Sequence, residues 1–241
     1  MKVTLGNVLK TKIIDIYIME TIKNVSYHNA EILNNIITIH NNGKPFDCDM
    51  TYSKGNFYGK FKVDGLDLEI QEPQYKFDVN PISDDVTKIE PWGKLPLEDE
   101  SIRSIVIDLP FVIASNKVPS LQNPKEGSNI IIKRFGSYYP YTELFKSYSH
   151  WLGEAYRVLK DDGICVFKCQ NTITSSKFIC SEEYSWMAAQ KQGFYVLDKF
   201  ILIAKNRLIS GKVKNQQHAR NYSSTFYVFK KGGKIKPIQY S

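Results

Sequence analysis

Hydrophobic and polar positions along the chain repeat with the periods of strands and helices. Residues 105–107 form a β-branched run, Ile-Val-Ile, which is typical of a strand buried on both faces, and residues 164–169 form a second apolar run. Between the two runs, apolar side chains recur at helical spacing over residues 141–159, with Glu154 and Arg157 expected on the outward face. A strand, a helix and a further strand in this order indicate an α/β sheet.

The same reasoning predicts elements on both sides of this core. Ser26 is expected to cap a helix that runs to His40 and stops at the Asn41-Asn42-Gly43 turn. The other expected elements are a short strand ending at Asp49, a half-exposed strand or hairpin within residues 58–74, a strand over 75–81 with Asp78 at its end, a helix over 184–192, a strand or strand pair over 193–203 and a last strand over 222–230.

Length and composition favour one domain. With 241 residues the chain can bury a full core without disulfides or metal, and we expect a single domain over residues 1–241 with an N-terminal extension over 1–25. The four cysteines are scattered and are expected to be reduced and mostly buried, which is typical of a cytoplasmic protein. Neither a membrane-spanning segment nor a signal-peptide pattern is evident.

The chain is moderately basic, with a formal net charge of +7 and a sequence pI near 9.0. Such a balance favours polyanionic partners through phosphate contacts, although many basic proteins bind none. The charge therefore gives mild support to a nucleic-acid substrate.

The candidate chemistry lies at the end of the 105–107 strand, where Asp108, Leu109, Pro110 and Phe111 follow one another. In open α/β sheets, ligands bind outside the carboxyl ends of the strands. A carboxylate, a restricted backbone and an aromatic ring would therefore surround one pocket. The alternative is an ordinary strand end that turns into a loop.

This tetrapeptide resembles the Asp-Pro-Pro-Tyr/Phe/Trp catalytic motif of amino-methyltransferases, which methylate exocyclic nitrogens of bases. Leu109 stands where the family usually has its first proline, so the main chain is less constrained here. The resemblance implies that Asp108 accepts a hydrogen bond from the target amine, that the carbonyl of Leu109 or Pro110 accepts another, and that Phe111 stacks on the base. It implies S-adenosylmethionine as cofactor and no metal.

A second resemblance concerns the segment after the strand that ends at Asp49. Its small, polar turn with Gly55 is similar to the cofactor-binding loop of class I S-adenosylmethionine-dependent methyltransferases, although only one glycine is present. The cofactor-binding residues that this resemblance implies are Asp49, Thr51, Tyr52, Ser53, Gly55 and Phe57, with Asp78 for the ribose hydroxyls and Asp85 for the adenine amino group. A polar loop between two strands and a solvated acidic turn are the alternatives.

The string Glu-Ala-Tyr-Arg-Val-Leu-Lys over residues 154–160 is the most specific local match, because it is similar to the helix-turn-strand that follows the catalytic strand in many class I methyltransferases. The motifs also occur in the order of that family, with the cofactor loop before the catalytic motif. The resemblance extends from about Ser26 to Lys231. It implies a Rossmann-like class I methyltransferase fold, with a mostly parallel central sheet and a C-terminal antiparallel strand.

Two polar segments, residues 115–140 and 205–220, are candidate substrate loops. Their basic and aromatic side chains suit phosphate contacts and base stacking; the residues concerned are Lys133, Arg134, Tyr138, Lys212, Lys214, His218 and Arg220. A solvated basic loop is the alternative. The expected substrate is adenine N6 or cytosine N4, in DNA rather than RNA, while an inactive methyltransferase-fold binding subunit and an enzyme acting on RNA or a small molecule remain open.

Overall fold

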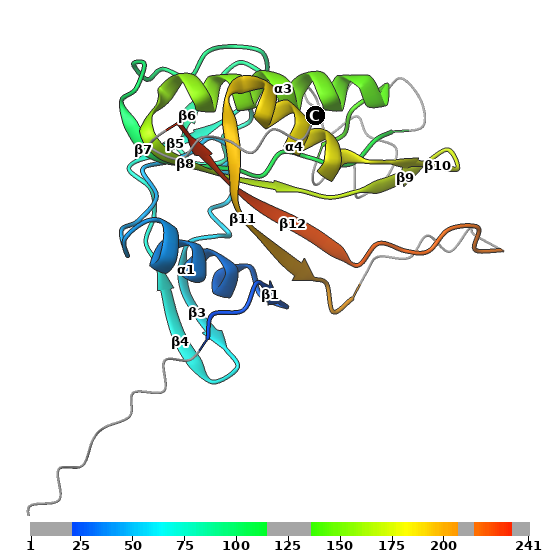
Figure 1. The fold of residues 1–241 in the computed structure, drawn as a ribbon, viewed down its shortest axis with the longest axis horizontal. Coiled ribbons are helices and arrows are strands. Elements are labelled where there is room, and N and C mark those ends of the chain that lie inside the picture. Colours follow the sequence, from blue (N-terminus) through cyan, green and yellow to red (C-terminus); the bar gives the residue numbers. More distant parts are fainter. Residues whose placement is uncertain (1–20, 115–135, 207–214, 233–241) are drawn as a thin grey trace, which may run out of the picture.

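The computed structural model of the protein describes residues 21–114, 136–206 and 215–232. Within these ranges, eight strands form one open sheet in the order β1-β11-β12-β8-β7-β2-β5-β6 (Figure 1). Its strands are β1 (Val25–Ser26), β2 (Cys48–Asp49), β5 (Tyr75–Asp78), β6 (Thr87–Lys88), β7 (Ile102–Ile107), β8 (Leu159–Cys169), β11 (Phe194–Ile203) and β12 (Ser223–Lys231). Neighbouring strands run parallel except at β12, which is antiparallel to both β11 and β8. The expected mostly parallel sheet with a C-terminal antiparallel strand is confirmed.

Helices cover one face of this sheet, and a helix with a hairpin covers the other (Figure 1). On the first face lie α3 (Tyr141–Val158) and α4 (Ser181–Gln192); on the second lie α1 (Asn29–His40) and the hairpin of β3 (Gly59–Val63) and β4 (Leu66–Ile70). A smaller hairpin, β9 (Thr172–Thr174) with β10 (Lys177–Ile179), extends beyond β8. The expected helices and the hairpin within residues 58–74 are thus confirmed, and residues 193–203 form one strand rather than two.

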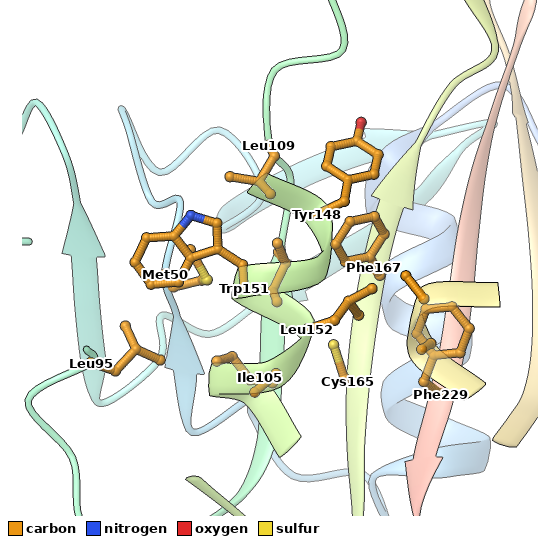
Figure 2. Close-up of a cluster of buried hydrophobic side chains, with 14 of the residues drawn as sticks. Met50, Leu95, Ile105, Leu109, Tyr148, Trp151, Leu152, Cys165, Phe167 and Phe229 are labelled. Carbon is orange, nitrogen blue, oxygen red and sulfur yellow. The ribbon is translucent and has the colours of Figure 1, made fainter. Parts of the chain in front are cut away.

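The larger core lies between α3, α4 and the sheet (Figure 2). Trp151 and Leu152 of α3 pack in one buried cluster with Ile105 of β7 and with Cys165 and Phe167 of β8. Since alternate residues of a buried strand face opposite sides, Val106 and Val166 enter the second cluster instead, together with α1. The apolar runs at residues 105–107 and 164–169 therefore serve two cores at once.

The N-terminus of α1 differs from the expectation. The helix begins at Asn29 with His28 at the cap position, and no side chain bonds to the free amides of the first turn. Ser26 does not cap the helix: its hydroxyl accepts a hydrogen bond from the N–H of His28 at 2.9 Å and donates one to the carboxylate of Glu31 at 2.5 Å. The residue fixes the turn before the helix, which the cap pattern alone does not distinguish from a true cap.

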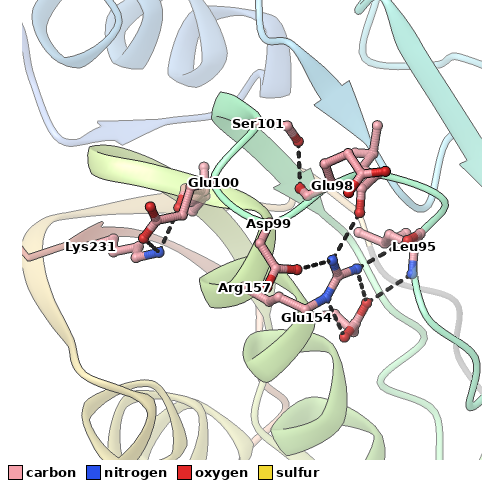
Figure 3. A network of polar contacts seen from close by, with 10 residues as sticks. Leu95, Glu98, Asp99, Glu100, Ser101, Glu154, Arg157 and Lys231 are labelled. Atoms are coloured by element: carbon pink, nitrogen blue, oxygen red, sulfur yellow. Dashed lines mark hydrogen bonds and ion pairs between the residues drawn. The ribbon is translucent and has the colours of Figure 1, made fainter.

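Contrary to expectation, Glu154 and Arg157 do not face solvent (Figure 3). Glu154 is buried and accepts a hydrogen bond from the N–H of Leu95, while Arg157 donates to the carbonyls of Leu95 and Leu97 and to the carboxylate of Asp99. Although burial raises it, hydrogen bonds from Arg157 and from the Leu95 N–H hold the pKa of Glu154 below its ordinary value. The polar face of α3 is covered by the extended segment that precedes β7, and helical periodicity cannot show such a cover.

The order of the strands places a topological switch between β2 and β7. After β2 the chain adds β5 and then β6 on one side, and it continues on the other side of β2 with β7. β2 is parallel to both neighbours, with Cys48 and Asp49 opposite Ile105 and Val106 of β7. Ligands of open α/β sheets bind in the crevice at such a switch point, beyond the carboxyl ends of the strands. In this protein Asp49 and Asp108 stand at the carboxyl ends of the two strands that flank the switch point.

The remaining expectations concern cysteines and the termini. Cys48, Cys165 and Cys169 are buried and Cys180 is exposed; all four are free thiols. In the described ranges there is no helix that has both the length and the apolar character needed to span a membrane. The expected N-terminal extension lies outside the described residues up to residue 20.

Candidate active site

Asp108 stands at the carboxyl end of β7 and is held at two points. Its backbone N–H donates to the hydroxyl of Thr51 at 2.7 Å, and its carboxylate oxygen Oδ2 accepts a hydrogen bond from Lys168 at 3.0 Å. Among the described residues the other carboxylate oxygen, Oδ1, has no hydrogen-bond partner. The side chain is 24% exposed, so this oxygen can accept a bond from a ligand.

Asp49, at the carboxyl end of β2, is joined to the same site through Thr51. Its carboxylate accepts hydrogen bonds from the Thr51 N–H at 2.8 Å, from the Thr51 hydroxyl at 3.1 Å and from the Tyr58 hydroxyl at 2.7 Å. Burial raises the pKa of Asp49 to about 7; these hydrogen bonds oppose the shift and the negative charge of Asp108 adds to it. Thr51 thus connects the ends of the two strands that flank the switch point.

Asp78 at the end of β5 fixes the loop that follows β2. Its carboxylate accepts hydrogen bonds from the N–H groups of Ser53 at 2.8 Å and Asn80 at 2.7 Å. The N–H of Tyr52 bonds to the carbonyl of Phe77 at 3.0 Å. Three expected cofactor-binding residues, Tyr52, Ser53 and Asp78, therefore lie together, and Asp78 remains half-exposed with capacity for further donors.

The structure explains the glycine at position 55 by a contact within the protein. Its φ of +66° lies in the left-handed region, and a Cβ at this position would stand 2.6 Å from the hydroxyl oxygen of Tyr52. The space beside the glycine is thus occupied by Tyr52, whose ring stacks on Tyr58 with centroids 5.5 Å apart. The glycine shapes the loop, and its bare Cα faces a side chain of the protein rather than an open space for a ligand.

Asp85 is exposed and forms an ion pair with Lys76. Lys76 also pairs with Glu72 at 3.1 Å and lies over the ring of Tyr52, 5.3 Å from its centroid. Hydrogen bonding to Lys76 lowers the pKa of Asp85. The residue is therefore tied to the outer side of the Tyr52 loop and is not a freely solvated acidic turn.

Lys168 is the site residue that sequence reasoning missed. It belongs to β8, and its ammonium lies 5.1 Å from the ring centroid of Phe57 and 5.5 Å from that of Phe226. The side chain is only 12% exposed. A lone lysine within the apolar run of residues 164–169 was the available signal, because a buried ammonium needs a nearby acceptor.

The Asp108 motif divides between the site and the core. Leu109 is 7% exposed and packs in the larger core cluster with Tyr148 and Trp151 of α3 (Figure 2). Pro110 and Phe111 are half-buried after it. The leucine that replaces the usual proline therefore anchors the motif to the core by its side chain.

Tyr138 does not lie where it could stack on a substrate base, contrary to expectation. It is 2% exposed, its hydroxyl hydrogen-bonds to that of Ser147 at 3.0 Å, and its backbone pairs with Val112 and Ala114. A tyrosine in a loop is equally compatible with core packing, and only the tertiary structure distinguishes the two. The residue stabilises the chain that follows the Asp108 motif.

The structure describes two of the other expected substrate-binding residues, His218 and Arg220. His218 is exposed and Arg220 half-buried, just before β12 begins at Ser223. Because β12 is antiparallel, with Thr225 opposite Cys169, its start lies at the carboxyl edge of the sheet, on the same side as Asp108. Lys133, Arg134, Lys212 and Lys214 lie outside the described residues.

Comparison with known families decides the affiliation. Residues 102–241, more than half of the chain and beginning at the first residue of β7, match the N6_N4_Mtase family model, which is described as DNA methylase. The chain belongs to this DNA methylase family. The match includes Asp108, Lys168 and the segment before β12, whereas the segment from Asp49 to Asp78 precedes it.

Solved structures are similar at low identity. A Thermus thermophilus protein assigned as a DNA modification methylase, complexed with S-adenosyl-L-methionine, is 11% identical with a TM-score of 0.38, over 60% of this chain and 51% of that one. The cytosine-N4-specific PvuII DNA methyltransferase is 17% identical, with a TM-score of 0.38, over 56% of this chain and 44% of that one. The cyclase SpnF is 10% identical, with a TM-score of 0.42, over 83% and 80%. The chain spans about half the length of the two methylases, and no curated protein matches it.

Proposed function

We propose that this member of the DNA methylase family is an S-adenosylmethionine-dependent methyltransferase that acts on an exocyclic amino group in DNA, adenine N6 or cytosine N4. The observation that carries the proposal is the position of Asp108. It lies beside the switch point at the carboxyl end of β7, within the region that matches the family, and no described residue bonds to one of its two carboxylate oxygens.

The polar groups at the switch point fit this cofactor. Ribose hydroxyls are hydrogen-bond donors, and Asp78 presents a half-exposed carboxylate at the end of β5. When bound, the cofactor supplies an electrophilic methyl group on a good leaving group. We assign its binding to the Asp49–Phe57 loop with Asp78 and Asp85.

The chain contributes orientation rather than a strong acid or base. Asp108 Oδ1 would accept an N–H of the target amine, and the carbonyl of Leu109 or Pro110 would accept the other, which turns the nitrogen lone pair toward the methyl group. Phe111 would stack on the base. As the nitrogen gains positive charge, the carboxylate stabilises it electrostatically. The Thr51 hydroxyl keeps the backbone of Asp108 in place for this role.

DNA is favoured over a small molecule because the expected substrate residues are basic and because the family model is that of a DNA methylase. His218 and Arg220 precede β12, whose first residues lie at the same edge of the sheet as Asp108. We propose that they and the basic residues of 115–140 and 205–220 hold the phosphate backbone, and that residues 1–241 act as a single methyltransferase domain.

Methyl transfer from labelled cofactor to separate pools of DNA, RNA and metabolites tests the proposal. We expect the label in DNA, on N6-methyladenine or N4-methylcytosine after digestion. Asp108→Ala should abolish transfer and leave cofactor affinity within a few-fold of the parent. Label in RNA or in a metabolite would replace the proposed substrate. Cofactor binding without transfer to any pool would indicate an inactive methyltransferase-fold subunit.

A further inference from the structure

We propose that Lys168 is a positioning residue for Asp108. Its ammonium fixes one carboxylate oxygen and cancels the charge of the carboxylate, so that the site offers a neutral amine an acceptor without trapping the cationic cofactor. The inference rests on the proposed function and assigns a role within the same site.

The hydrogen bonds of Asp108 divide its carboxylate into a fixed and a free half. Oδ2 bonds to Lys168 at 3.0 Å, while Oδ1 has no partner in the described part of the chain. The N–H of Asp108 is fixed separately by Thr51. With the backbone and one oxygen both held, the remaining oxygen keeps a defined direction, which is what orientation of a target amine requires.

Lys168 has no competing carboxylate within the described ranges. Asp108 is its one ion-pair partner there, and the rings of Phe57 and Phe226 lie beside the ammonium. Phe226 is also its direct neighbour on β12. A largely buried ammonium is costly without a partner, so the aromatic faces and the Asp108 carboxylate together account for a charged residue in this strand.

The pair has a consequence for the two forms of the cofactor. S-adenosylmethionine is a cation at sulfur, whereas the product S-adenosylhomocysteine is neutral there. A bare carboxylate would therefore favour the substrate form, and a bare ammonium would disfavour it. With both present the charges offset each other, and the site discriminates less between the two forms by charge.

Binding of both forms to the full chain tests this inference. Lys168→Met should increase the preference for S-adenosylmethionine over S-adenosylhomocysteine about tenfold, while Asp108→Asn should decrease it about threefold. The double variant should return to within about twofold of the parent. Lys168→Arg keeps the charge and should retain the parent's preference. It provides a second variant if Lys168→Met does not fold.

Lys230→Met is the matched control. Lys230 also pairs with an aspartate at 3.0 Å, Asp162, but it lies opposite Ile164, at the other end of the pairing between β12 and β8. Its removal should leave the preference unchanged. A merely structural role of Lys168 would weaken binding of both forms equally, and equal effects in Lys168→Met and Asp108→Asn would overturn the inference.

The two proposals fail in different ways. If the parent binds neither form of the cofactor, the proposed function and this inference both fall. If the parent methylates DNA but the preference is the same in the parent, Lys168→Met, Asp108→Asn and the double variant, only the role of Lys168 is refuted. If the two single variants shift the cofactor preference in opposite directions but the parent transfers no methyl group to DNA, the role of Lys168 is supported and the proposed substrate is refuted.

Discussion

Asp49 shows how a single buried carboxyl links the site to the solution pH. The residue is 2% exposed, and its three hydrogen bonds do not fully compensate for the loss of water. Its pKa of about 7 lies well above the value of about 3.9 in an unfolded chain. The folded protein therefore binds the Asp49 proton more tightly than the unfolded chain does.

Asp49→Asn is expected to change the pH dependence of stability. In the parent, the contribution of Asp49 to the free energy of unfolding is largest below about pH 4, falls as the pH rises and is lost above about pH 7. Between these two values the folded state holds a proton that the unfolded chain has released. The asparagine cannot ionise and keeps the shape. At pH 8 we expect the variant to be more stable by about 2 to 4 kcal/mol, with a smaller slope between pH 4 and 7, in urea unfolding.

Asp64→Asn serves as the control, since the Asp64 side chain is 78% exposed. It should follow the parent curve. If Asp49→Asn runs parallel to the parent over the whole pH range, Asp49 does not hold a proton at neutral pH.

The loop between β2 and β3 depends on its glycine. Gly55→Ala introduces a Cβ at a positive φ and within 2.6 Å of the Tyr52 hydroxyl oxygen, so the Tyr52 ring must move. We expect a loss of about 1 to 3 kcal/mol in stability and weaker cofactor binding, measured by urea unfolding and calorimetry. Gly65→Ala is the matched comparison, because its φ is +90° but no atom lies within 4 Å of the added Cβ. Equal effects of both variants would show that strain, not Tyr52, decides.

Arg157 ties α3 to the segment that precedes β7. Arg157→Met leaves Glu154 buried without its cation and removes the guanidinium donor from the carbonyls of Leu95 and Leu97, of which Leu95 keeps only the Leu97 N–H. We expect a loss of about 2 to 4 kcal/mol in the free energy of unfolding, measured in urea. Lys146→Met, which removes an exposed pair with Glu143, should cost less than about 0.5 kcal/mol. Comparable losses would mean that the network adds nothing beyond a surface pair.

Most elements could be predicted from the sequence because their periodicity is local. The helices over 141–158 and 29–40 and the buried strands β7 and β8 follow from apolar spacing alone. The burial of Glu154 could not be predicted, because the segment that covers it is distant in sequence. The burial of Tyr138 could not be predicted either, because a tyrosine in a loop can equally face solvent or pack in the core. For the site, the placement of Asp49, Asp78 and Asp108 at strand ends was accessible. The pairing of Asp108 with Lys168 was not, because it joins residues 60 positions apart.

At the scale of the whole molecule, the net charge of +7 predicts the salt dependence of substrate binding. Affinity for polynucleotide should fall steeply with salt, and affinity for S-adenosylmethionine should barely change in the same titration. Neutralising Lys212 and Lys214 together should reduce the salt slope by about one unit for each lost phosphate contact. A salt-insensitive enzyme, or a double variant that binds polynucleotide as the parent does, would favour a small-molecule substrate.

The sheet itself is joined unevenly. β12 pairs with β11 over nine registered positions and with β8 over six, whereas β2 meets β7 over two. The strand that ends at Asp49 and the strand that ends at Asp108 are thus joined by a short pairing, to which the hydrogen bond from Asp108 to Thr51 adds. A ligand that contacts both strand ends would bind the folded protein and not the unfolded chain. Its binding would therefore raise the free energy of unfolding. Such binding would be measured as a rise of the urea unfolding midpoint with ligand concentration.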